Sequence, residues 1–193
     1  MKMNIWSDET LLNRFSKGNE EAFVTLMNRY SSSVKGYALR ILRNEEHAEE
    51  ICTETFFRIA LQKGKWEAKG YSFKSYLFRI AHNLSIDVIR KRAMHRKKEG
   101  EVIQFSRIIK KQSNPEEDLQ QKEREEMLQV ALMQLEDEER ELVLLRSTHG
   151  FSAKETATIL GIGATQVDAR YAYARTKLKK AIGNLYQQKR KLL

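Results

Sequence analysis

Apolar side chains recur every three or four residues along the first half of the chain, the spacing of one buried face of an α-helix. The first such stripe consists of Phe23, Leu26, Met27, Tyr30, Val34, Tyr37, Ala38 and Ile41. Asn44 then precedes a second helix as its N-cap, and the inner stripe of that helix contains Ala48, Ile51, Cys52, Thr55, Phe56 and Ile59. Between this helix and the next, the sequence without helical period predicts a loop that ends near Ser72. A third helix over residues 73–92 turns one face inward, with Leu77, Ile80, Ala81, Leu84 and Val88.

The second half of the chain begins with a break in this pattern. Residues 93–113 have weak periodicity and a high positive charge, which predicts a linker. Asn114 and Pro115 then indicate a new helix start. Two helical stretches follow, with Leu128, Ala131, Leu132 and Leu135 in the first and Leu142, Val143 and Leu145 in the second.

A helix-turn-helix pattern occupies residues 151–178. Ser152 and Glu155 have the spacing of a capping box, and Gly161 supplies the positive φ of a tight turn. The small Ala157 lets the second helix approach, and Val167 packs that helix onto the first. The second helix extends to Lys180, and the alternative is an ordinary helical hairpin with a glycine turn.

Composition supports an all-α fold, because the chain has one proline and nine glycines in 193 residues. We therefore predict two small helical domains, over residues 1–95 and 122–193, joined by a basic linker over residues 96–121. The second domain contains the helix-turn-helix.

The net charge of +9 arises from basic blocks on either side of an acidic block at residues 114–146. A polyanion is the natural partner of such blocks: nucleic acid is the first choice and an anionic membrane surface the second. The alternative is that the lysines only keep the helices soluble. We expect a soluble, cytosolic protein without membrane insertion, because no long apolar run is present. One cysteine and four scattered histidines predict no disulfide, metal site or cofactor.

Two surfaces in the first domain are candidates for binding. Aromatic residues alternate with lysine and arginine over residues 65–92, which suits stacking on unpaired bases; we expect Phe73 or Phe78 to be buried instead. On the second helix, Phe57 lies on the outer face among acidic residues, which indicates a contact with another protein.

Residues 44–60, 73–92 and 135–182 resemble, in order and spacing, the bacterial RNA polymerase sigma factors of the extracytoplasmic-function (ECF) type in the sigma-70 family. The resemblance covers nearly the whole chain. It implies a transcription initiation factor that binds core RNA polymerase and directs it to specific promoters. It also implies promoter DNA, both duplex and melted strand, as a partner, an anti-sigma factor as a regulator, and no small-molecule substrate.

The resemblance assigns roles to individual residues. The surface for core polymerase contains Glu49, Glu50, Thr53, Glu54, Phe57 and Arg58. The elements that open and read the minus-ten element contain Lys63, Lys65, Trp66, Lys69, Tyr71, Tyr76, Arg79, Asn83, Asp87, Arg90 and Arg92. The reader of the minus-thirty-five element contains Ser152, Thr165, Gln166, Asp168, Ala169, Arg170, Ala172, Tyr173, Arg175 and Lys177.

Some positions depart from the family pattern. Thr53 stands where an amide or acid is common, Asp168 where a basic residue is usual, Ala169 where a serine is common, and Tyr173 where a cation is frequent. One hypothesis is that Asp168 accepts a hydrogen bond from a cytosine amino group and that Tyr173 packs on a thymine methyl group or reaches a phosphate.

Two other functions compete with the sigma-factor interpretation. A stand-alone DNA-binding regulator would also have a C-terminal helix-turn-helix. An enzyme fits least, because the sequence has no glycine-rich phosphate loop, no supported cysteine–histidine pair and no metal-spaced cluster.

Overall fold

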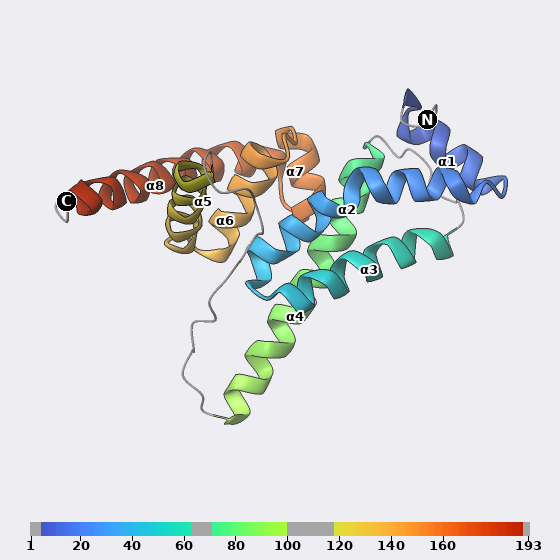
Figure 1. Ribbon diagram of the computed structural model, residues 1–193. Helices are drawn as coiled ribbons and strands as arrows, with labels where there is room; N and C mark the ends of the chain where they lie inside the picture. Colours follow the sequence, from blue (N-terminus) through green and yellow to red (C-terminus); the bar gives the residue numbers. More distant parts are fainter. Residues whose placement is uncertain (1–4, 63–70, 100–117, 191–193) are drawn as a thin grey trace. The chain divides into compact units, whose positions relative to one another are not determined.

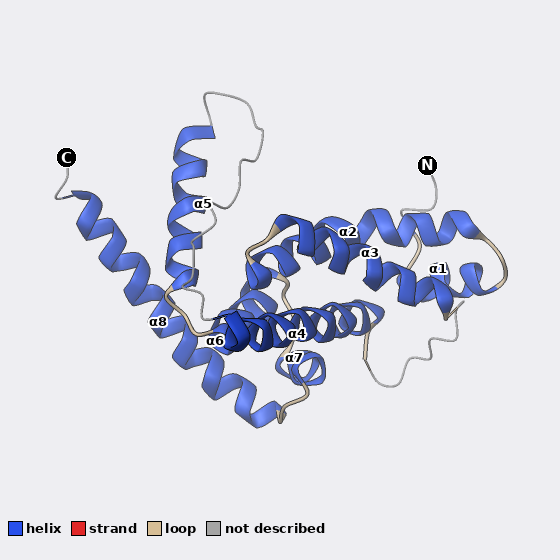
Figure 2. Ribbon diagram, turned by 90° about the horizontal axis from the view of Figure 1, so that it is seen from below, coloured by secondary structure: helices blue, strands red, loops and turns tan. Residues whose placement is uncertain are grey.

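The computed structural model describes residues 5–62, 71–99 and 118–190, and every regular element within these ranges is helical (Figures 1 and 2). The chain divides into two compact units. Helices α1 to α4 lie in the first, whereas α5, α6, α8 and the start of α7 lie in the second. The predicted all-α fold is therefore confirmed. None of the described helices is long and apolar enough to cross a membrane.

The N-terminal unit is built around one long helix. α2 (Glu20–Leu42) packs against α1 (Asp8–Ser16), α3 (Glu45–Leu61) and α4 (Phe73–Glu99), and α3 also packs against α4 (Figure 1). Each of the first three helices has an N-cap side chain that accepts a hydrogen bond from a backbone N–H of the first turn. These N-cap residues are Ser7, Asn19 and Asn44. The predicted N-cap at Asn44 is confirmed.

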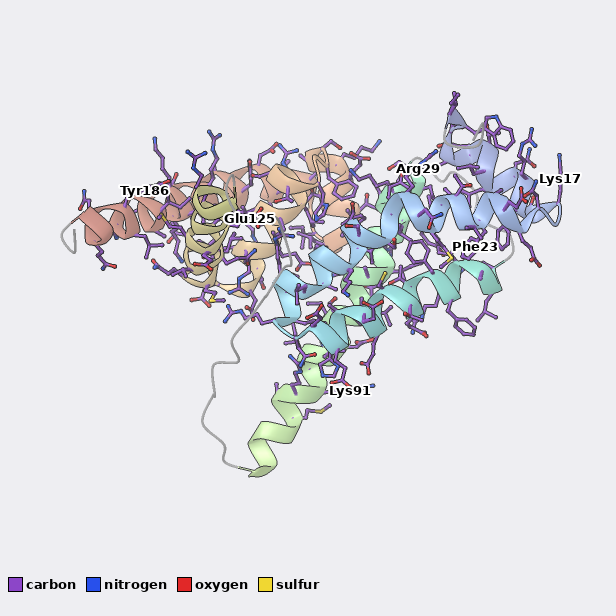
Figure 3. All side chains as sticks on the ribbon, viewed as in Figure 1. Lys17, Phe23, Arg29, Lys91, Glu125 and Tyr186 are labelled. Carbon is purple, nitrogen blue, oxygen red and sulfur yellow. The ribbon has the colours of Figure 1, made fainter. Side chains whose placement is uncertain are left out.

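Aromatic rings join the helices of this unit. Phe23 of α2 stacks on Phe15 of α1, with ring centroids 4.6 Å apart, and meets Phe56 of α3 edge-on at 6.3 Å (Figure 3). Tyr37 and Phe78, both fully buried, bring α2 and α4 together. The whole predicted inner stripe of α3 is buried, and so are both Phe73 and Phe78.

A polar cluster attaches the first helix to α2. The guanidinium of Arg29 donates to the carboxylate of Asp8 and, at 2.9 Å, to the carbonyl of Trp6 (Figure 3). The hydroxyl of Tyr30 donates to the same carboxylate. Burial, with that acceptor beside it, raises the pKa of Tyr30, so its hydroxyl keeps its proton.

The last helix of the N-terminal unit is longer than the sequence pattern indicated. α4 continues to Glu99, although the helix was expected to end at residue 92. Residues 96–99 are straight-chain residues with high helix propensity, and they prolong a helix that is already nucleated. The other end of the proposed 96–121 linker is also helical, because α5 begins at Asp118.

The C-terminal unit contains α5 (Asp118–Met133), α6 (Asp137–Val143), a π-helical turn (Leu144–Thr148) and α8 (Ala164–Arg190), together with the start of α7 (Ala153–Leu160). α8 packs against α5 and α6. The predicted core positions of α5 and α6 are buried, except Leu128, which is 39% exposed. α8 continues ten residues beyond its expected end at Lys180, to Arg190.

A buried arginine of α6 forms hydrogen bonds to the segment that connects α5 and α6. The side chain of Arg140 is 4% exposed, and its guanidinium donates to the carbonyls of Leu132 and Leu135 at 2.9 and 2.8 Å and to the Asp137 carboxylate at 2.6 Å. The Leu132 carbonyl lies in the last turn of α5 and also accepts a hydrogen bond from the Leu135 N–H at 3.3 Å, whereas Leu135 lies just beyond the helix. Arg140 therefore adds a donor at the Leu132 carbonyl and supplies one to the Leu135 carbonyl.

We expect Arg140→Met to lower the free energy of unfolding of the C-terminal unit by about 1–3 kcal/mol, because the Leu135 carbonyl loses its donor and a buried carbonyl without a donor costs about that much. Hydrogen–deuterium exchange of the full chain measures this, since it follows α5, α6 and α8 separately from the N-terminal unit. The matched control is Arg124→Met, at an exposed position of α5. Equal protection in the two variants would contradict a capping role for Arg140.

Candidate functional site

The connection between α7 and α8 has the geometry of a helix-turn-helix. The Ser152 hydroxyl accepts from the Glu155 N–H at 3.2 Å, and the Glu155 carboxylate accepts from the Ser152 N–H at 3.0 Å. Gly161 has φ of 68°, and Ala157 and Val167 are buried. The predicted capping box and glycine turn are confirmed. The Ser152 hydroxyl is hydrogen-bonded within the cap. Its proposed contact with DNA stays a prediction.

One side of α8 faces outward over its first three turns. Val167, Ala174 and Ala181, spaced seven residues apart, are buried and form the seam that attaches the helix to its unit. The positions on the opposite side of the helix are exposed, and they are Thr165, Ala169, Ala172 and Thr176. Tyr173, beside them, is 62% exposed. From Thr165 to Thr176, the outward side of α8 is therefore uncharged.

Three charged residues expected to meet DNA form ion pairs within the C-terminal unit. Asp168 pairs with Arg146 at 3.3 Å, Arg170 with Glu138 at 3.3 Å and Lys177 with Glu139 at 2.7 Å. All three lie on the flanks of α8, between the buried seam and the outward side. Gln166 and Arg175, the other flank positions expected to meet DNA, are exposed.

The Lys177–Glu139 pair changes the pKa of both of its members. The hydrogen bond to Glu139 raises the pKa of Lys177. Burial acts to raise the pKa of Glu139, but the hydrogen bonds from Lys177 and from the Glu136 backbone outweigh it, and the pKa of this carboxyl is lowered. Both groups are therefore charged at neutral pH. The Lys177 ammonium also lies 5.6 Å from the centre of the Tyr173 ring.

Arg146 is a residue that the sequence pattern did not identify. It comes from the π-helical turn, and its guanidinium donates to the Phe151 carbonyl at 2.9 Å and to Asp168. The same guanidinium lies 5.2 Å from the centre of the Tyr171 ring. The hydroxyl of Tyr171 is 2.8 Å from that of Ser147. No motif spacing marks Arg146, because its partners are brought near by folding.

A second exposed stripe runs along α4. Tyr76, Arg79, Asn83, Asp87 and Arg90 follow one another at steps of three and four residues, so they share one face of the helix. Tyr76 is half-buried and the other four are exposed. The structure therefore brings together all five predicted residues of this helix face.

The residues around this stripe fall into three groups. Tyr71 stacks on Tyr76, with ring centroids 6.4 Å apart, and the Tyr76 hydroxyl donates to Gln62 at 2.6 Å. The guanidinium of Arg92 donates, at 3.0 Å, to the carbonyl of Leu42, the last residue of α2. The remaining predicted residues of this group, Lys63, Lys65, Trp66 and Lys69, lie outside the described residues.

The outer face of α3 is acidic and carries an apolar end. Glu49, Glu50, Thr53, Phe57 and Arg58 are exposed and Glu54 is half-buried. Glu49 pairs with Lys35 of α2, whose pKa is raised by that hydrogen bond, and Glu54 pairs with Arg58 at 2.8 Å. Leu61, which was not among the residues predicted for this surface, is 66% exposed one turn beyond Phe57. Its spacing of four residues from Phe57 was the available signal.

Within the described ranges, no group of three His, Cys, Asp or Glu side chains is placed to hold a metal ion.

Comparisons with known proteins give a consistent result. Residues 26–94 match the family model described as Sigma-70 region 2, and residues 125–178 match the one described as Sigma-70, region 4. The chain is 30% identical over 176 residues to the RNA polymerase sigma factor CarQ of Myxococcus xanthus, which covers 90% of this chain and 97% of the relative. It is 27% identical over 180 residues to the ECF RNA polymerase sigma factor SigW of Bacillus subtilis, which covers 90% of this chain and 96% of the relative.

Solved structures show the same fold. The sigma factor RpoE of Bartonella quintana, in complex with the anti-sigma factor NepR, matches with a TM-score of 0.70 and 23% identity, over 83% of this chain and 96% of its own. CnrH, in complex with the cytosolic domain of CnrY, matches with a TM-score of 0.67 and 22% identity, over 92% of this chain and 97% of its own.

Two arginines of α4 differ in their surroundings: Arg92 donates a hydrogen bond to the end of α2, whereas Arg90 is exposed. We expect Arg92→Met to lower the free energy of unfolding of the N-terminal unit by about 1 kcal/mol, because the Leu42 carbonyl loses its donor. The control Arg90→Met, at an exposed position, should change it by less than about 0.5 kcal/mol. Urea unfolding followed by exchange of the α2 and α4 amides measures both. A larger loss in the Arg90 variant would show that the two roles are reversed.

Proposed function

The chain belongs to the ECF type of the sigma-70 family, and we propose on this basis that it binds core RNA polymerase and directs it to specific promoters. The observation that most favours this function is the presence of both matched regions in one chain, each with an exposed helix face. A sigma factor needs one surface for each promoter element. The family itself is regulatory, and we assign no catalytic residue.

In the N-terminal unit, we assign the minus-ten element to the exposed stripe of α4. Arg79 and Arg90 supply positive charge for the DNA backbone, and Asn83 supplies an amide that can both donate and accept. The stacked pair Tyr71 and Tyr76 lies at the start of the same helix, where an aromatic surface can support an unstacked base. The inward contact of Arg92 favours a structural role over direct contact with DNA.

We assign core-polymerase binding to the outer face of α3. Phe57 and Leu61, which are 54% and 66% exposed, lie at the end of this acidic helix face. An exposed apolar pair beside charged residues is the composition of a protein interface with an apolar centre and a polar rim. A solvated helix face would not require two large apolar side chains one turn apart.

In the C-terminal unit, we assign the minus-thirty-five element to α8. The helix-turn-helix leaves its outward side free for the major groove. Exposed Arg175, Lys179 and Lys180 are available to phosphates.

Regulation by an anti-sigma factor follows the same family argument. In one of the matched structures, the sigma factor RpoE is bound to the anti-sigma factor NepR. We propose an anti-sigma factor as a partner of this chain too, and a cytoplasmic location, where polymerase and promoter DNA are found.

Reconstituted transcription tests the function directly. We expect the purified chain, mixed with core polymerase, to start transcription at promoters selected from a library of genomic fragments. Core polymerase alone is the control. Tight, sequence-specific binding to duplex DNA without polymerase, with no transcription when polymerase is added, would identify a stand-alone regulator instead.

The polymerase surface can be tested separately from promoter recognition. We expect Phe57→Ser to weaken binding to core polymerase about five- to thirtyfold, the cost of removing a central interface residue. Val24→Ser, which changes a 51% exposed valine on α2, is the matched control. Fluorescence anisotropy of the labelled chain titrated with core polymerase measures both. If Phe57→Ser bound as tightly as Val24→Ser, the interface would lie on another face.

A further inference from the structure

The acidic residue on the DNA-reading helix has a partner within its own unit. Asp168 is exposed, yet its carboxylate lies 3.3 Å from the guanidinium of Arg146. Arg146 itself is only 23% exposed in its side chain, and it also donates to the Phe151 carbonyl. The guanidinium thus joins the π-helical turn, the residue before the α7 cap and the first turns of α8.

The position of Asp168 on the helix favours this internal contact over a base contact. It directly follows the buried Val167, so it lies about 100° around the helix from the seam. The side opposite the seam belongs to Thr165, Ala169 and Ala172. Asp168 is therefore on the flank of the helix, where Arg146 reaches it.

The charge of Asp168 also requires compensation. A carboxylate on a helix that approaches DNA is repelled by the phosphates, and the cost falls when a cation lies beside it. Arg146 supplies that cation from within the protein. Its second contact, with the ring of Tyr171 at 5.2 Å, fixes the guanidinium against α8 at one more point.

We propose that Asp168 is a positioning residue that acts through Arg146: the pair sets the orientation of α8 in the major groove, and promoter bases are contacted by the outward side chains Ala169, Ala172 and Tyr173. This inference rests on the assignment of α8 to the minus-thirty-five element. It predicts that Asp168 affects how tightly a promoter is bound and not which bases are preferred.

A double-mutant cycle on the reconstituted holoenzyme tests the pair. Promoter affinity is measured for the unchanged chain, Arg146→Met, Asp168→Ala and the double variant, after thermal unfolding has shown that each is folded. We expect Asp168→Ala to weaken binding about two- to fivefold, the range of an exposed ion pair, and the loss to be smaller when Arg146 is already changed. The cycle of Asp168→Ala with Arg170→Met, a residue that pairs with Glu138 instead, is the control and should be additive.

The second readout is base preference. The same four proteins are tested against every single-base change of the selected minus-thirty-five element, and we expect Asp168→Ala to leave the ranking unchanged. Additive losses in the Arg146 cycle, or an altered preference at one base pair with Asp168→Ala, would overturn the proposal. If Arg146→Met does not fold, the ranking measured with Asp168→Ala alone decides. Absence of any specific promoter binding by the unchanged holoenzyme would instead refute the assigned function.

Discussion

The two longest helices in the described ranges each bury one side and keep another exposed, and the proposed functional surfaces depend on this constraint. α4 and α8 both have 27 residues. The seam of α8 consists of small side chains at Val167, Ala174 and Ala181, whereas α4 buries larger ones such as Phe73 and Phe78. The narrow seam of α8 leaves most of its circumference accessible, and α4, which buries a wider side, keeps the face with Arg79, Asn83 and Arg90 exposed. One such helix in each unit provides the two faces that two separated promoter elements require.

The polar contacts of α8 explain how a reading helix can present an uncharged outward side. Asp168, Arg170 and Lys177 form ion pairs with Arg146, Glu138 and Glu139, which hold the flanks of the helix. Exposed ion pairs contribute little to stability. The buried seam determines which side of α8 points outward, and the ion pairs engage the charged side chains on its flanks. Because few cations remain on the first turns of α8, strong binding to duplex DNA by this helix alone is not expected. Promoter affinity then depends on the N-terminal unit and on polymerase, as in a factor that acts as a subunit.

Local patterns in the sequence predicted much of this architecture. The inner stripe of α3, the caps at Asn44 and Ser152 and the glycine turn at Gly161 depend on residues within a few positions of one another, and all were found. Met27 and Leu128 were expected in the core but are 36% and 39% exposed. Periodicity identifies a helix face but not which neighbour covers each point of it.

Contacts between distant residues were beyond such patterns. The Arg146–Asp168 pair joins positions 22 residues apart, and Arg92 reaches the carbonyl of Leu42 across 50 residues. The roles of Asp168 and Arg92 were assigned from family resemblance alone, and the structure added partners that change how both are interpreted. Arg140 and Leu61 were not predicted because hydropathy places charged residues at the surface and apolar residues in the core. Arg140 is a buried charged residue, and Leu61 is an exposed apolar one.

Site-specific photo-crosslinking in the holoenzyme tests most directly whether the two faces read two promoter elements. A photoreactive residue is placed at Asn83 on α4 or at Ala172 on α8, both exposed, and each holoenzyme is bound to the same selected promoter. We expect crosslinks from position 83 to the minus-ten element and from position 172 to bases of the minus-thirty-five element. Crosslinks from both positions to one element, or from position 172 to the polymerase alone, would contradict this assignment.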